Sequence, residues 1–147
     1  MVKVHSVEMI EHSALSTPDV TAHAALPNGA LVGLTYTNSS KVTKAPATGS
    51  DLYIVLNEQV GDDSYVANYT IPAGDYVNVF ALKNWVGKEL DVTVDNVTSM
   101  TGVAAGDTLT FDATTFKFKK ASATSGDIAF KVMALTTFGV RVLIYVA

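Results

Sequence analysis

The chain has 147 residues, of which 48% are hydrophobic and only 16% are charged; its formal net charge is −4 and it contains no cysteine. This length suits a single domain with a sizeable core, and the lack of cysteine excludes disulfides and thiolate chemistry. The acidic balance argues against a nucleic-acid partner, since the longest basic stretch is the short run at residues 117–120. No stretch is long and apolar enough to span a bilayer, so we expect no membrane partner either.

The N-terminal segment, residues 1–28, differs from the rest of the chain. It starts with a short strand-like alternation, residues 7–15 hold only a weak helical rhythm, and Pro18 and Pro27 interrupt the remainder of the segment. We interpret it as an irregular arm or edge whose apolar side chains need cover from a partner. The candidate contact residues are Val2, Val4, Val7 and Ile10. A rival interpretation makes residues 1–6 the first strand of the barrel. These residues also lack the apolar core of a signal peptide, which predicts synthesis in a cytoplasm without export.

From Asn28-Gly29 onward the pattern becomes regular, with short apolar runs separated by turn residues. Three turns stand out because each joins a small residue, glycine and aspartate just before an alternating run: Ala73-Gly74-Asp75, Ala105-Gly106-Asp107 and Ser125-Gly126-Asp127. Glycine supplies the positive φ of a tight reversal, and period-two alternation is typical of a half-buried strand. The expected strands cover residues 30–37, 52–56, 65–71, 76–82, 90–94, 109–111, 116–119, 128–135 and 140–146. We therefore predict an all-β protein, an antiparallel barrel or sandwich of about eight to ten strands over residues 29–147.

The alternation also predicts which side chains face the core. Residues 90–94 show the clearest inside/outside pattern, with valines or leucine at every second position. The residues expected to point inward are Val92, Val94, Phe111, Phe130, Val132, Val142 and Ile144.

Residue types that act as metal ligands or catalytic groups are present, but their spacing in the chain does not suit these roles. His5, His12 and His23 lack the spacing of metal ligands, and residues 91–96 lack the glycine that turns a calcium loop. There is no nucleophile elbow and no phosphate-binding glycine loop. Glu58 and Glu89, with the aspartates, could supply the carboxylate pair that a glycosidase needs, but 14 acidic residues in 147 give many such pairs by chance. We predict no metal, no cofactor and no catalytic residue.

Trp85, the single tryptophan, lies in the segment that joins two predicted strands. It is a candidate sugar-stacking platform or partner-binding anchor, because aromatic side chains recur in both roles. The competing interpretation is a loop residue that folds back onto the end of the barrel.

The order of the turns resembles a known family. Ile71-Pro72-Ala73-Gly74-Asp75 with its strand, Gly87-Lys88-Glu89-Leu90, and Val103-Ala104-Ala105-Gly106-Asp107 succeed one another as in the small head-decoration (capsid cement) proteins of tailed bacteriophages. The resemblance covers residues 29–147 and rests on turn chemistry. It implies a non-enzymatic structural protein on the capsid exterior of the virion, which ties neighbouring major capsid subunits together and self-associates into a homo-oligomer.

Two other classes of function remain open from the sequence. One is a carbohydrate- or receptor-binding β-sandwich module, which would present Trp85 and nearby tyrosines on one exposed face. The other is a small β-barrel enzyme with two carboxyl groups in one concave pocket.

Overall fold

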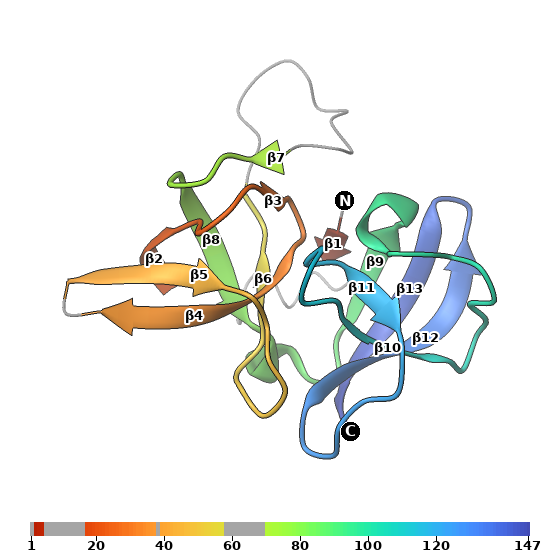
Figure 1. Ribbon diagram of the computed structural model, residues 1–147. Coiled ribbons are helices and arrows are strands. Elements are labelled where there is room, and N and C mark those ends of the chain that lie inside the picture. Colours follow the sequence, from red (N-terminus) through yellow and green to blue (C-terminus); the bar gives the residue numbers. More distant parts are fainter. Residues whose placement is uncertain (1, 5–16, 38, 58–69) are drawn as a thin grey trace.

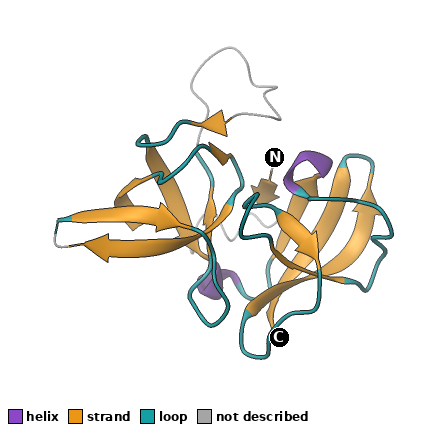
Figure 2. Ribbon diagram, viewed as in Figure 1, coloured by secondary structure: helices purple, strands orange, loops and turns teal. Residues whose placement is uncertain are grey.

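The protein is folded almost entirely into strands (Figures 1 and 2). The computed structural model describes residues 2–4, 17–37, 39–57 and 70–147. Within these ranges thirteen strands and two short 3-10 helices form a closed barrel, a six-stranded sheet and a two-stranded sheet. The predicted all-β class is confirmed. The strands are more numerous than expected, because the N-terminal segment contributes three of its own and residues 40–44 form a further one.

The closed barrel makes up one lobe, at the left of Figure 1. Its strands, in the order in which they pair, are β2 (Thr17–Thr21), β5 (Ser40–Lys44), β4 (Leu31–Thr37), β6 (Tyr53–Val55) and β8 (Tyr76–Ala81). β8 pairs with β2 to close the barrel. Every pairing is antiparallel except that of β2 with β5. The two-stranded sheet of β3 (Leu26–Pro27) and β7 (Thr70–Ile71) lies beside this lobe.

The six-stranded sheet forms the second lobe and is antiparallel throughout. Its order is β1 (Val2–Val4), β9 (Glu89–Thr93), β13 (Gly139–Val146), β12 (Ile128–Thr136), β10 (Thr108–Phe111) and β11 (Phe118–Lys120). Helix η1 (Leu82–Trp85) connects β8 to this sheet, and η2 (Val94–Asn96) comes directly after β9. The longest strands, β12 and β13, form a hairpin in the middle of the sheet.

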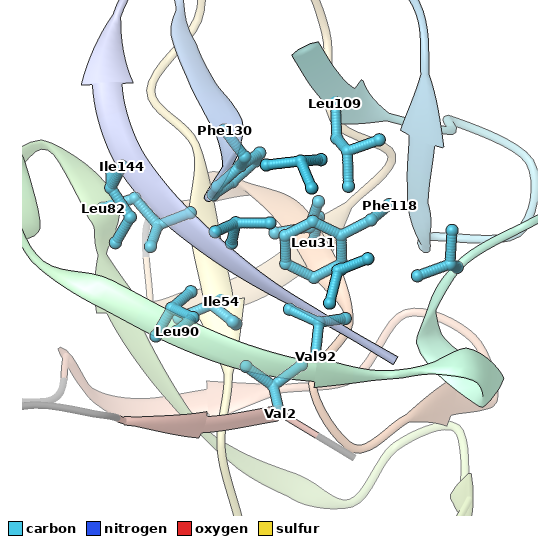
Figure 3. Close-up of a cluster of buried hydrophobic side chains, with 14 of the residues drawn as sticks. Val2, Leu31, Ile54, Leu82, Leu90, Val92, Leu109, Phe118, Phe130 and Ile144 are labelled. Carbon is cyan, nitrogen blue, oxygen red and sulfur yellow. The ribbon is translucent and has the colours of Figure 1, made fainter. Parts of the chain in front are cut away.

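The two lobes share one hydrophobic core because two barrel strands are buried on both faces. In β4, Val32 points into the barrel while Leu31 packs with the six-stranded sheet. In β6, Val55 likewise points into the barrel and Ile54 packs with the sheet. Figure 3 shows Leu31 and Ile54 together with Leu90, Phe118 and Phe130. A strand buried on both faces needs a continuous apolar run instead of an alternating one. The runs at residues 30–34 and 52–56 have this pattern.

One turn geometry starts five of the strands. In the turn at Gly106, this glycine has a φ of +92°, and the N–H of Asp107 donates to the carbonyl of Ala104. The N–H of Gly106 donates to the carbonyl of Val132, and the N–H of Val132 donates to the carbonyl of Asp107. Gly106 and Asp107 thus lie opposite the single residue Val132, which is the geometry of a glycine β-bulge attached to a tight turn. The same pattern recurs at Gly29, Gly74, Gly87 and Gly126, which dock on Val55, Ala22, Ile144 and Ala147. The three turns singled out in the sequence all belong to this set.

The conformational demand on these glycines can be tested at Gly106. A Cβ added there would have no atom within 4 Å, so alanine would meet only the cost of a left-handed backbone. We expect Gly106→Ala to lower the free energy of unfolding by about 1–2 kcal/mol in urea denaturation. Gly106→Asn should lose clearly less, because asparagine tolerates the left-handed region. Equal losses for the two variants would contradict the assignment of the cost to φ.

Where it is described, the segment expected to be an arm is part of the fold. β1 pairs with β9, β2 is a barrel strand, and β3 pairs with β7. The side chain of Val2 is buried in the shared core, and Val4 pairs through its backbone with Leu90. Residues 2–4 thus agree with the rival interpretation, although they form an edge of the sheet and not part of the barrel. Val7 and Ile10 lie outside the described residues.

The core prediction holds for all but two of its residues. Val92, Phe130, Val132, Val142 and Ile144 are buried, and Phe111 is partly buried against the same core. The prediction for Val94 is wrong, because its side chain is 50% exposed. β9 ends at Thr93, the last residue of this strand that pairs with β13, so Val94 lies outside the strand and begins η2.

Candidate functional site

The carboxylates of the described residues are used largely to hold the fold. Asp91 accepts a hydrogen bond from Nε of Arg141 at 2.9 Å, and Asp51 pairs with Lys83 at 3.0 Å. Asp112 accepts the backbone N–H groups of Thr114 and Thr115 in the loop between β10 and β11. Asp127 accepts the N–H of Gly49 and so joins the barrel lobe to the sheet lobe.

The pKa values of Asp107 and Asp112 shift in the direction opposite to that of a general acid. The pKa of Asp107 is lowered by the hydrogen bond from Lys120, at 2.7 Å, and by the N–H of Ala104. The pKa of Asp112 is lowered by the N–H groups of Thr115 and Thr114. A carboxyl group that donates a proton near neutral pH instead needs a raised pKa. Both groups are therefore ionised turn and ion-pair residues.

The histidine and glutamate candidates form no site among the described residues. Nδ1 of His23 lies 2.7 Å from Oγ1 of Thr43, its ring meets the ring of Phe116 edge-on at 5.3 Å, and burial lowers its pKa. No group of three metal-ligating side chains occurs in the described ranges. His5, His12 and Glu58 lie outside the described residues, and Glu89 lies on β9 in the sheet lobe.

Trp85 is not an exposed platform. It ends η1, is 2% exposed and contacts Phe80 at a ring-centroid distance of 5.2 Å. Its burial in the shared core corrects its assignment as a partner-binding residue and agrees with the interpretation of a residue folded back onto the domain. The two lobes bury the indole because η1 is the link that passes from one to the other.

An open groove of about 700 Å³ lies beside β10 and the end of β13. Four of the polar side chains that line it are already paired with one another. Lys120 binds Asp107, and the hydroxyl of Tyr145 lies 3.1 Å from that of Thr108. A ligand here would have to displace these interactions, so the groove is not a site built for one.

A group of exposed apolar side chains lies at the end of the six-stranded sheet where β12 and β13 are joined. Three apolar side chains are exposed there, Val94 (50%), Leu135 (55%) and Phe138 (74%), and we call them the tip patch. The N–H of Val94 donates to the carbonyl of Phe138, and Leu135 pairs with Val140 across the hairpin. In Figure 1 this tip lies at the upper right, at the other end of the sheet from the C-terminus.

Leu135 and Phe138 were not predicted to be exposed. A signal was present, because residues 132–140 contain no charged side chain although they include the turn of a hairpin. Hairpin turns are normally polar, so an apolar turn is informative.

The fold and surface define a class of structure and not a biochemical family. The chain is an all-β protein in which a closed five-stranded barrel and a six-stranded sheet share one core. It matches no protein-family model, no curated protein and no solved structure. Neither helical segment in the described part of the chain has the length or apolarity to cross a membrane.

Proposed function

We propose that the protein is a capsid decoration protein, which binds the outer surface of an assembled bacteriophage head and stabilises it by bridging major capsid subunits. The observation that carries this proposal is the division of labour among the described side chains. Asp107, Asp112 and Asp127 are used in turns and ion pairs. Val94, Leu135 and Phe138 are left exposed at one end of the six-stranded sheet.

The resemblance to cement proteins supports the same function. Its glycines, Gly74, Gly87 and Gly106, all lie in turns that dock on a neighbouring strand through paired hydrogen bonds. Such turns fix the ends of strands and so stiffen a small β protein. A stiff body suits a protein that must bridge two subunits without yielding.

Stabilisation would result from mass action. A protein that binds only the assembled lattice lowers the free energy of that lattice and not of its dissociated subunits. Repetition of the site over the capsid then makes a modest affinity per copy effective.

The other two classes of function have less support. A carbohydrate-binding module needs exposed aromatic side chains on one face, whereas Trp85 is buried, and the exposed rings of Tyr36, Tyr76 and Phe138 lie on different elements. A glycosidase needs one carboxyl group with a raised pKa, whereas the pKa values of Asp107 and Asp112 are lowered.

The test is binding to capsids assembled from the major capsid protein encoded in the same genome. We expect the purified protein to cosediment with expanded heads, to saturate at a fixed ratio to the capsid subunit, and to raise the temperature at which the heads disassemble. Compact precursor heads serve as the control and should bind less. Absence of a capsid gene from that genome, or failure to bind expanded heads, would overturn the proposal.

A further inference from the structure

We infer that the tip patch, Val94, Leu135 and Phe138, is the surface that docks on the capsid, and that it inserts into a shallow apolar pocket with a neutral to basic rim on a major capsid subunit. This inference rests on the proposed function and deepens it by naming the contact.

The patch is the uncovered end of the inner face of the sheet. Val92 and Val140, a cross-strand pair, are the last residues on that face that the barrel lobe covers. Beyond the next pair, Thr93 and Gly139, the N–H of Val94 donates to the carbonyl of Phe138, so the two segments stay side by side past the end of β9. Leu135 lies opposite Val140 across the hairpin and therefore on the same face of the sheet. The apolar face therefore continues past the point where the protein's own core ends.

The patch is also held in shape before any partner arrives. Gly139 lies so close to β9 that a Cβ on it would be 2.0 Å from the carbonyl oxygen of Val92. The hydrogen bond from Val94 to Phe138, at 2.9 Å, ties the hairpin turn to the start of η2. Preorganised apolar anchors lose little conformational entropy when they bind, which is typical of the residues that dominate protein interfaces.

Few charged residues lie near the patch along the chain, and this bears on the kind of partner that it fits. No charged residue lies between Lys131 and Arg141, and Arg141 is itself neutralised by Asp91. The nearest remaining charge along the chain is the carboxylate of Asp95, beside Val94. A nucleic acid or an anionic membrane would need basic residues here. An apolar protein pocket with a neutral to basic rim complements this surface instead.

The experiment compares Phe138→Ser with Tyr76→Ser in binding to expanded heads. Tyr76 is a matched control, because it is 72% exposed but lies on the barrel lobe. We expect Phe138→Ser to weaken binding by at least about tenfold and Tyr76→Ser to leave it unchanged, with the thermal midpoints of both free proteins unaltered. Salt should change the binding little, because the contact has few charges to screen.

A second measurement places a photoreactive benzophenone side chain at position 138 or 76. Position 138 should crosslink to the capsid subunit and position 76 should not. If the wild type binds heads but both serine variants bind equally well, the docking surface is elsewhere and the proposed function stands. If the wild type does not bind heads, the proposed function fails. Phe138-dependent self-association in sedimentation velocity, or flotation with neutral phosphatidylcholine vesicles, would overturn the capsid pocket in favour of a second copy or a lipid surface.

Discussion

Phe130→Ala should lower the free energy of unfolding by about 3–5 kcal/mol, as expected when a fully buried aromatic side chain is truncated. Phe130 has no exposed surface and meets Phe118 edge-on at a centroid distance of 4.7 Å, in the core that both lobes share. The barrel lobe presses Leu31 and Ile54 onto the same core. The surrounding side chains belong to strands locked in pairs, so they cannot close the cavity.

The measurement is urea denaturation monitored by circular dichroism and by the fluorescence of Trp85. Because Trp85 is the only tryptophan and lies in the shared core, its emission reports directly on the contact between the lobes. Met133→Ala, an exposed position on the same strand, is the control and should cost less than about 1 kcal/mol. A loss below about 1 kcal/mol for Phe130→Ala would show that the shared core is not what stabilises the protein.

Gly139→Ala should destabilise the protein by more than the roughly 1–3 kcal/mol of ordinary overpacking. The added Cβ would lie 2.0 Å from the carbonyl oxygen of Val92 and 2.8 Å from Cα of Thr93, both backbone atoms of β9. β9 cannot retreat, because β1 pairs with its other edge. The end of β13 must therefore separate from β9, and the hydrogen bond between Val94 and Phe138 would be lost with it.

Gly106→Ala is the natural comparison, since its cost is conformational while that of Gly139→Ala is steric. The same urea experiment should rank Gly139→Ala as clearly the worse of the two. Equal stability of the two variants would show that β9 and β13 can separate at little cost, and that the tip patch is less rigid than its hydrogen bonds indicate.

Several features were predictable because they depend on neighbours in the chain. The turns at Gly74, Gly106 and Gly126 were recognisable because positive φ is a local demand that glycine meets. The inward positions of Phe130 and Val142 were deduced from alternation alone. The turn at Gly87 was harder to recognise, because lysine takes the place of aspartate after the glycine.

Other features depended on partners that no local pattern names. Alternation predicted an inward Val94, but β9 ends at Thr93 and the side chain of Val94 is half exposed. Trp85 looked equally suited to a surface or a core, and the passage of η1 between the lobes decided for the core. The prolines and weak periodicity of the segment before residue 28 predicted an irregular arm. Within it, however, β2 pairs in parallel with β5 and antiparallel with β8.

The sequence by itself thus determined the β class, the places where the chain turns and the inner face of most strands, because glycine conformation and side-chain alternation act over a few residues. The tertiary structure decided that two β lobes share one core, and that the apolar face of the sheet runs past the end of that core at Val94, Leu135 and Phe138. The physical reason is that burial is a property of two surfaces in contact, and the second surface here comes from strands far away in the chain.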